Sequence, residues 1–364
     1  TEIYTLSLHD ALPIYPRARP NRDPITVYPR VPPGATTIGH HCRTPQSGAS
    51  AAAAPRTVRG SAPCAVVLHY GTSPMEPRTL SYEIVDSVER IPRLEWDAVF
   101  GDIPEGYDFY RTLELSSPPG FSFFYATIFD RNRLLAIAPL FVCDYPLDTG
   151  LHGAAGRLVR RLRRAFPRLF VTRTLFCGSP FSEYGVIGVR PGAKDPGGLV
   201  EELLRALDGF SRARNLPCIV FKDFRECDAV LLEPLRRRGF ARVRGLPTVV
   251  TDLQSPTFDG YLKALSRSTR KDVRRTVRKA PAEARVRAEI ADDVAPIADE
   301  VHRLYLNTWG AGGARFGQLT KEFFLHAGAQ MKPRVLFFLY RADGRLAAFN
   351  LCLVHKDLLL DKYI

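Results

Sequence analysis

Two stretches of this chain, EIVDSVERI (83–91) and EIADDVAPI (289–297), repeat one pattern at a distance of 206 residues. Both begin with a Glu-Ile pair and place an Asp two residues after the Ile. Both then continue with a Val and an Ile at the same spacing. We expect each copy to form a short strand, an acidic helix cap and then a helix.

The likeness continues beyond these stretches. Each copy next reaches a Trp and a Gly, and a β-rich segment follows: FSFFYATIFDRNRLLAIAPLFVC (121–143) in the first copy and RVLFFLYRADGRLAAFNLCLV (334–354) in the second. In each segment two apolar runs flank a polar turn, DRNR or ADGR, which predicts a β-hairpin. Three matches in the same order indicate two similar α/β units.

The first copy is longer than the second. It continues with an amphipathic helix (196–217), a buried strand (218–224) and a further helix, whereas the second copy stops soon after its hairpin. We therefore predict a mixed α/β fold with mixed sheets, made of two tandem units at residues 75–255 and 256–364. We expect the second unit to be incomplete.

Residues 1–74 have a different character. They begin with Thr, contain eleven Pro and show no apolar periodicity, and the first well-patterned segment starts at Met75. We expect this stretch to be a Pro- and Ala-rich extension without fixed structure, or translated upstream sequence before a start at Met75.

The net charge of +13 is concentrated in a few places. Residues 261–280 hold eight Lys or Arg and one acid, and residues 157–173 hold seven Arg and no acid. Residues 1–74 contribute +4, so everything else in 75–364 sums to −5. Such local charge favours recognition of a particular anion over a nucleic-acid coat. The Arg run could lie on an anionic membrane as a short amphipathic helix, or be a solvated insertion.

The cysteines and the hydropathy point to the cytoplasm. Seven Cys are scattered without a CxxC pair or a metal-ligand spacing, so we expect no metal site and no disulfide framework. No apolar run reaches the ~18–20 residues of a membrane helix, and the N-terminus lacks a signal-peptide pattern. Four Cys lie in apolar runs, which predicts buried free thiols: Cys143, Cys177, Cys218 and Cys352.

The pattern resembles the FemAB-like branch of the GNAT acyltransferase superfamily. The segment FDGYLKALSRSTRKDVRRTVRKA (258–280) is similar to the basic helix that opens the second unit in that family. CGSPFSEYGVIG (177–188) is similar to its Pro-Phe-[Ser/Thr]-[Asp/Glu]-Tyr-Gly-Gly element, with Val186 in place of the second Gly. The third similar segment is FFLYRADGRLAAFNLCLVHKDLLLDKY (337–363), so the resemblance covers roughly residues 80–364.

The resemblance implies a tandem GNAT-like fold and transfer of an acyl or aminoacyl group to an amine. The acceptor would be a small molecule or a cell-envelope precursor. Deprotonating the amine needs a base, and Glu183 and Tyr363 are the catalytic candidates. Ser182, Tyr184 and Asp361 are the candidates for substrate binding.

The donor stays open between acyl-coenzyme A and aminoacyl-tRNA. The Gly-rich stretch GVRPGAKDPGG (188–198) has no clear Gly-x-Gly loop to hold a pyrophosphate at a helix N-terminus. We expect acyl-coenzyme A, if it is used, to be a co-substrate, and we expect no bound cofactor.

The basic segment 258–280 reads as one helix with an apolar stripe beside a basic stripe. Because it holds a single acid, its like charges oppose the helix unless an anion binds. Arg270, Lys271 and Arg274 are therefore candidates for binding a substrate phosphate, since Arg suits bidentate contact. The alternatives are a solvated helix face, a non-catalytic RNA- or tRNA-binding module, or an inactive fragment. For the enzyme we expect no stable nucleic-acid partner.

Overall fold

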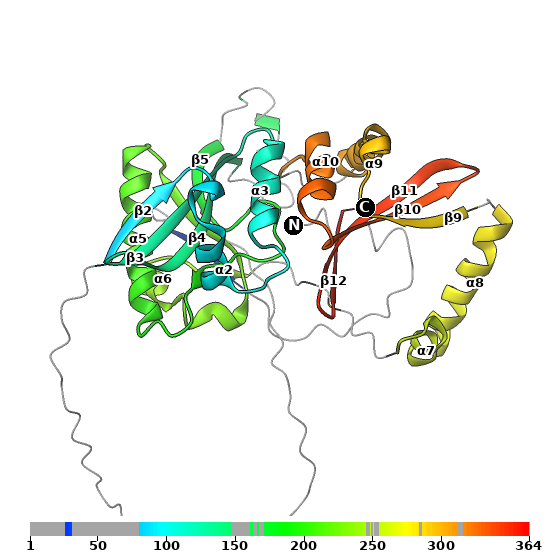
Figure 1. Cartoon of the computed structure of the whole chain (residues 1–364), viewed down its shortest axis with the longest axis horizontal. Helices are drawn as coiled ribbons and strands as arrows, with labels where there is room; N and C mark the ends of the chain where they lie inside the picture. Colours follow the sequence, from blue (N-terminus) through cyan, green and yellow to red (C-terminus); the bar gives the residue numbers. More distant parts are fainter. Residues whose placement is uncertain are drawn as a thin grey trace, which may run out of the picture.

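Two β-sheets with helices packed on them make up the part of the chain that the computed structural model describes (Figure 1). The described residues are 26–30, 80–146, 161–162, 166, 171–244, 248, 250, 255–283, 286–311 and 316–363.

The first sheet follows the first copy of the repeat. Its strands are β1 (Thr26–Arg30), β2 (Leu80–Val85), β3 (Ser122–Asp130), β4 (Arg133–Pro146), β5 (Val171–Cys177), β6 (Gly188–Val189), β7 (Cys218–Phe224) and β8 (Val243–Arg244). They lie in the order β2-β3-β4-β5-β7-β1-β8, and β6 pairs with β4. The β5–β7 pair is parallel and the other pairs are antiparallel, which confirms the predicted mixed sheet.

Helices cover both faces of the first sheet. They are η1 (Val88–Arg90), α2 (Arg93–Phe100), α3 (Tyr107–Ser116), α5 (Pro196–Ala213), η2 (Glu226–Ala229) and α6 (Glu233–Arg237). Neighbouring residues on a strand point to opposite faces. On β3, Phe124 therefore packs with α5 residues such as Leu203, whereas Tyr125 packs with Trp96 of α2.

The second sheet repeats this element order. Its strands are β9 (Val286–Ala291), β10 (Val335–Ala342), β11 (Arg345–His355) and β12 (Leu358–Tyr363), and its helices are η3 (Ala295–Ile297), α9 (Ala298–Ala311) and α10 (Lys321–Gln330). The sheet is antiparallel, in the order β12-β11-β10-β9. Both copies thus run strand, 3₁₀ turn, two helices, hairpin, strand. The strand and the hairpin confirm the prediction from the repeat, but each copy has a 3₁₀ turn and two helices where one helix is predicted.

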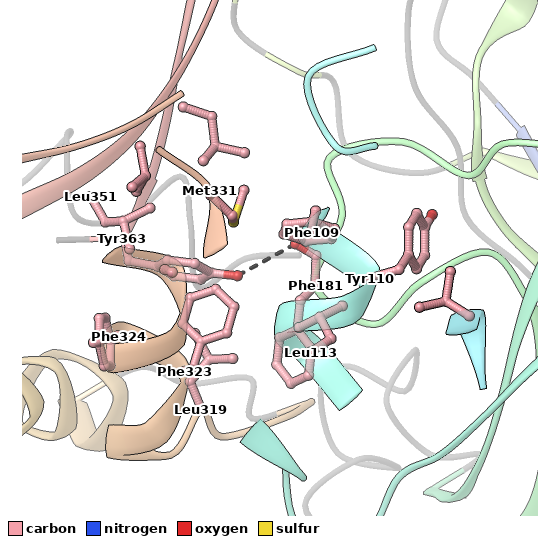
Figure 2. Close-up of a cluster of buried hydrophobic side chains, with 14 of the residues drawn as sticks. Phe109, Tyr110, Leu113, Phe181, Leu319, Phe323, Phe324, Met331, Leu351 and Tyr363 are labelled. Atoms are coloured by element: carbon pink, nitrogen blue, oxygen red, sulfur yellow. Dashed lines mark hydrogen bonds between the residues drawn. The ribbon is translucent and has the colours of Figure 1, made fainter. Parts of the chain in front are cut away.

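One hydrophobic core continues from the first sheet into the second (Figure 2). Helices α3 and α10 pack side by side, with Phe109 of α3 and Phe323 of α10 both fully buried in it. Thr320 Oγ1 donates a hydrogen bond to Ser116 O at 2.8 Å across this contact. The shared core fixes the two units against each other and brings the end of β12 to the first unit.

The basic segment forms two helices, so the single helix predicted for 258–280 is wrong. They are α7 (Phe258–Ala264) and α8 (Arg267–Glu283). The break has a local cause: the Ser266 hydroxyl accepts a hydrogen bond from Thr269 N at 3.2 Å, which caps a new helix. Leu262 and Val273 pack in a small cluster of their own. In Figure 1 the two helices lie at the periphery of the molecule, away from β5.

The expected unstructured leader contributes one strand. Residues 26–30 form β1, which pairs antiparallel with both β7 and β8. The rest of residues 1–74 lies outside the described residues, as does most of the Arg run 157–173. The membrane contact predicted for that run stays a prediction.

The four cysteines predicted as buried free thiols are buried and free, which confirms that expectation. Cys227 is free and exposed. Within the described ranges, no helix combines the length and the apolar character needed to cross a bilayer.

Candidate functional site

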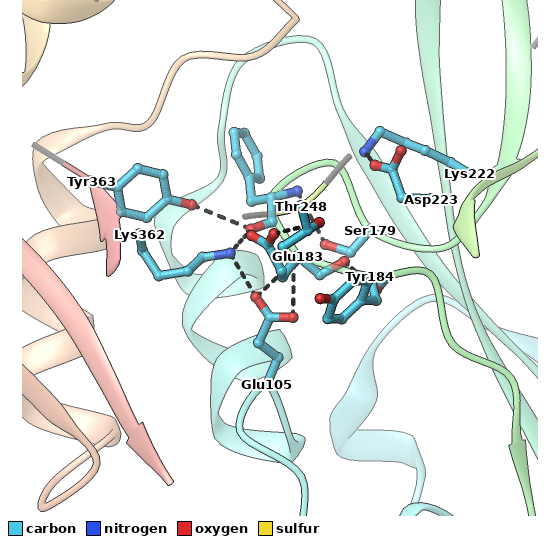
Figure 3. A network of polar contacts seen from close by, with 11 residues as sticks. Glu105, Ser179, Glu183, Tyr184, Lys222, Asp223, Thr248, Lys362 and Tyr363 are labelled. Atoms are coloured by element: carbon cyan, nitrogen blue, oxygen red, sulfur yellow. Dashed lines mark hydrogen bonds and ion pairs between the residues drawn. The ribbon is translucent and has the colours of Figure 1, made fainter. Parts of the chain in front are cut away.

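The polar centre of the molecule lies where the parallel strands β5 and β7 end. Their pairing stops at Cys177 and Phe221, and the loop from Gly178 to Gly185 follows β5, with Ser179, Glu183 and Tyr184 in it (Figure 3). Gly185 N donates to Asp223 O at 2.9 Å and so closes this loop onto β7. In open α/β sheets ligands bind outside the carboxyl ends of parallel strands, so this is the expected place for a site.

Two glycines let the loop approach β7 closely. A Cβ on Gly185 would lie 2.0 Å from Lys222 O and 2.8 Å from the Phe224 ring. Gly178 adopts φ +125, and a Cβ there would lie 3.1 Å from Lys222 O. The loop backbone therefore lies directly against β7, and a larger residue at 185 has no room.

Replacing Gly185 by Ala is expected to lower the free energy of unfolding by about 1–3 kcal/mol, because the added methyl overlaps a β7 carbonyl. Urea denaturation measures the change. Gly310 of α9 is the matched control: a Cβ there meets nothing within 4 Å, so Gly310→Ala should be neutral or stabilising. Equal stability changes in the two variants would contradict the close approach.

A buried ion pair joins the two units at this point. Lys362, at the end of β12, places Nζ 2.7 Å from Glu105 Oε1 in the loop before α3. The two side chains are 5% and 10% exposed, and Lys362 Nζ also donates to Phe181 O at 2.9 Å. Burial raises the pKa of Glu105, and the charge of Lys362 opposes that rise.

The Glu105 carboxylate also holds the backbone of the loop that runs from Gly178 to Gly185. Both oxygens of Glu105 accept from Glu183 N at 2.9 Å. The Glu183 side chain is partly exposed, and its Oε1 accepts from Thr248 Oγ1 at 3.2 Å. Among the described residues, Glu183 forms no ion pair with a Lys, Arg or His. Glu105 thus holds the backbone of a residue whose carboxylate contacts the Thr248 hydroxyl.

A second ion pair lies beside it on β7. Lys222 and Asp223 are consecutive and would point to opposite faces of a regular strand. Asp223 adopts φ +61, which breaks the alternation and lets Lys222 Nζ contact its carboxylate. Such a conformation is uncommon outside glycine and clusters at functional sites. Burial, followed by the charge of Lys362, lowers the pKa of Lys222 to about 8.

The stability of the protein is expected to rise with pH above about 8 because of Lys222. Its pKa is about 8 when folded against an ordinary 10.5, so between these values the unfolded chain binds more protons. Lys222→Met should remove this part of the rise, measured by urea denaturation at several pH values. The exposed Lys356→Met variant should keep the wild-type slope. An unchanged slope in Lys222→Met would contradict the assignment.

Three further residues singled out from the sequence lie in this network. Ser182 Oγ donates to Tyr184 O at 2.9 Å, which shapes the loop. The Arg225 guanidinium lies 5.6 Å from the centre of the Tyr184 ring, and burial raises the pKa of that phenol. Tyr363 OH donates to Phe181 O at 3.4 Å (Figures 2 and 3). The segment 182–184 and Tyr363, far apart in sequence, are therefore brought together.

Asp361 lies apart from this network. The β11–β12 register shifts between Leu351 and Cys352. Asp361 therefore stands opposite Cys352, whereas Tyr363 stands opposite its neighbour, the core residue Leu351, so the two side chains point to different faces of the sheet. Asn350 Nδ2 donates to the two Asp361 oxygens at 3.1 and 3.2 Å. Burial raises the pKa of Asp361.

The basic candidates are also elsewhere. Arg270 Nη2 donates to Lys263 O at 3.1 Å and to Leu265 O at 2.9 Å, so its side chain ties α8 to α7. Lys271 and Arg274 are exposed on α8. The structure does not bring these three residues to Glu183, and their role in phosphate binding stays a prediction.

Five residues of the network are not predicted from the sequence. One signal was available, because a Lys-Asp pair inside the apolar strand CIVFKDF marks charges that must be buried together. The Glu105–Lys362 pair gave no such signal, since its members are 257 residues apart. The five residues are Glu105, Lys222, Asp223, Thr248 and Lys362.

Comparison with known families decides the class of protein. The model of the FemAB-like family, described as peptidoglycan biosynthesis/recognition, matches residues 87–364. The chain belongs to the FemAB-like family. The fold of FemAB-like proteins is related to that of GNAT enzymes, and the mixed α/β architecture agrees with it. FemAB proteins are aminoacyltransferases of peptidoglycan synthesis, which makes this chain a member of a transferase family. No curated protein matches the chain.

The FemAB-like match includes the whole network around Glu183. The earliest residue of the network is Glu105 and the last is Tyr363, both inside the matched range 87–364. Strands β1 and β2 precede the matched range. The polar centre is therefore part of the FemAB-like portion of the chain.

Proposed function

We propose that this protein transfers an aminoacyl or acyl group from an activated donor to an amine of a peptidoglycan precursor, with Glu183 as the general base. The observation that carries the proposal is the charge of the network. Three carboxylates (Glu105, Glu183 and Asp223) face two ammonium groups, and Glu183 is the one whose side chain is not in an ion pair among the described residues.

This charge distribution suits an amine acceptor. A primary amine is an ammonium ion in neutral water, and a cation beside Glu183 restores neutrality to the network. Glu183 takes a proton from the ammonium group, and the free amine attacks the acyl carbon. The amide bond forms as the bond from the acyl carbon to the donor's oxygen or sulfur breaks, and the second proton lost by the nitrogen passes to that leaving oxygen or sulfur. The developing oxyanion needs a nearby positive group, and Lys222 supplies positive charge at the same strand end.

Tyr363 supports the site by its position and does not act as a proton donor. Its side chain is 4% exposed, and its hydroxyl donates to Phe181 O, next to the 182–184 segment. We therefore assign it to orienting the loop that carries Glu183. Ser182 and Tyr184 act with it by fixing the loop, and the partly exposed Tyr184 offers its ring to the acceptor.

Aminoacyl-tRNA is the favoured donor. This choice rests on the family, whose members are aminoacyltransferases that use aminoacyl-tRNA. Acyl-coenzyme A as a co-substrate is the competing donor and is included in the test.

The test gives the full chain each donor with nucleotide-linked and lipid-linked peptidoglycan precursors that carry a free amine. Mass spectrometry of the precursor reads out amide formation as a defined mass gain. We expect product with aminoacyl-tRNA and loss of product when the amine is acetylated beforehand. Absence of product with every donor and every amine would rule out the proposed reaction.

The exposed basic face of α8 favours a second candidate, binding of RNA phosphates without catalysis. Arg267, Lys271, Arg274 and Arg278 are exposed there. Lys and Arg contacts to phosphate make RNA affinity fall with salt. An affinity for RNA that does not change with salt concentration would rule this candidate out.

A further inference from the structure

Strand β9 forms an open edge of the second sheet (Figure 1). It pairs with β10 on one side, and within the described part of the chain no strand lies on its other side. Five of its six residues are exposed, among them Val286 at 50% and Ile290 at 62%. An exposed edge with apolar side chains is a template for pairing with another strand.

The charges of β9 also favour pairing with a strand of another molecule. Arg287 stands directly opposite Arg341 of β10 in the strand register, and like charges in that position destabilise a sheet. Arg341 donates to Glu289 at 2.6 Å. Arg287 forms no ion pair with a carboxylate among the described residues. This edge therefore carries Arg287 without a carboxylate partner and Glu289 two residues further on. A second copy of the same edge can supply a Glu to the Arg and an Arg to the Glu.

We infer that β9 pairs antiparallel with β9 of a second copy of this chain, in a register centred on Ala288. A two-fold axis perpendicular to the sheet relates the two copies of β9, and directly opposite residues of an antiparallel pair point to the same face. Opposite residues are therefore an even number of positions apart, so the residue at the axis stands opposite the same residue of the second copy. Centring on Arg287 or on Glu289 would oppose two like charges.

With Ala288 at the axis, the residues on either side of it pair favourably with those of the second copy. Arg287 then stands opposite Glu289 of the second copy, and the two-fold axis makes this contact twice. On the other face Val286 stands opposite Ile290 of the second copy, again twice. Opposite charges and paired β-branched residues are the cross-strand pairs that stabilise an antiparallel sheet.

The result is one continuous sheet made of two four-stranded sheets. The interface is the same patch on both copies, which gives a closed dimer and not a filament. It lies on the edge of the second sheet opposite to β12, whose end carries Lys362 into the polar centre. Dimerisation therefore stands or falls independently of the proposed transferase reaction.

Sedimentation velocity of the full chain over a series of concentrations tests the dimer. Wild type should show a monomer–dimer equilibrium. Arg287→Glu should raise the dissociation constant about tenfold or more, because it opposes acids at both symmetric contacts. The double variant Arg287→Glu/Glu289→Arg should restore the dimer, since the opposite charges are only exchanged. It also leaves an acid directly opposite Arg341, so the fold keeps an ion pair there.

The control is Arg345→Glu, an equally drastic change at an exposed Arg that begins β11. It should leave the equilibrium unchanged. A chain that is monomeric at every concentration would overturn the inference. So would a dimer that Arg287→Glu does not weaken, because its contact would lie on another surface.

A disulfide trap tests the register. Residues directly opposite in an antiparallel pair have Cβ atoms about 4.5–5.5 Å apart, near the span of a disulfide. Ala288→Cys should therefore give an oxidised dimer in which mass spectrometry finds two peptides joined through position 288. Ala348→Cys, at an exposed Ala of β11, should not. Absence of the linkage through 288 in a dimeric protein would overturn the register.

Discussion

Replacing Glu183 by Gln is expected to lower kcat for amide formation by about 10²–10⁴-fold, the usual loss when a general base is removed. Gln has nearly the same shape, so the side chain can still accept from Thr248 Oγ1. The backbone N–H at 183 still binds Glu105. The carboxamide cannot take a proton from the acceptor amine. Initial rates at saturating donor measure the loss.

Two controls separate chemistry from folding in the Glu183→Gln variant. Its urea midpoint should match that of wild type, because the contacts to Thr248 and Glu105 are kept. Glu300→Gln, a change at an exposed acid of α9, should leave kcat unchanged. A Glu183→Gln variant with wild-type kcat would exclude Glu183 as the base, even if the protein forms the predicted amide product.

Replacing Lys362 by Met is expected to lower the free energy of unfolding by about 3–5 kcal/mol at neutral pH, the usual cost of breaking a buried ion pair from one side. Met preserves most of the length of the side chain and removes its charge. Glu105 is then left buried without its cation, while the Phe181 carbonyl loses a donor. Urea denaturation measures the change.

The loss in Lys362→Met should shrink as the pH falls. Burial already raises the pKa of Glu105, and removing the opposing charge of Lys362 raises it further. Below that raised pKa the folded protein holds Glu105 protonated and neutral, so the penalty is present at neutral pH and disappears on acidification. A loss independent of pH would contradict the ion-pair explanation.

Two companion variants define the Lys362–Glu105 interaction. Lys362→Met/Glu105→Gln should cost less than the sum of the single changes, because no buried charge is left unpaired. Lys321 forms an ion pair with the well-exposed Asp299, so Lys321→Met should leave the urea midpoint nearly unchanged. If Lys362→Met costs no more than this surface control, the buried pair does not hold the two units together.

The sequence predicts the order of elements well where local patterns are strong. The hairpins around DRNR and ADGR and the helix from Pro196 have clear periodicity, and they form as expected. The prediction fails where one polar residue decides the outcome. Ser266 lies in a run with helical apolar spacing, but its hydroxyl caps a new helix and splits the basic segment in two.

The site could be predicted in part. Residues 182–184 stand out through a short motif, and their place at a strand end follows from the apolar strands around them. Glu105 and Lys362 could not be found in the same way, because nothing in the sequence near either residue indicates its distant partner. The role of Arg270 also depends on the fold, since its carbonyl partners exist only once the chain breaks between α7 and α8.

The position of Lys362 on β12 has a consequence for how this protein folds during its synthesis. Domains generally fold from the N-terminus while the ribosome is still adding residues. Glu105 and the strands of the first sheet leave the ribosome long before Lys362 is synthesised. Until β12 docks, the nascent first unit must keep Glu105 protonated or in contact with water. Catalytic competence is therefore expected only after this contact of very long sequence separation has formed.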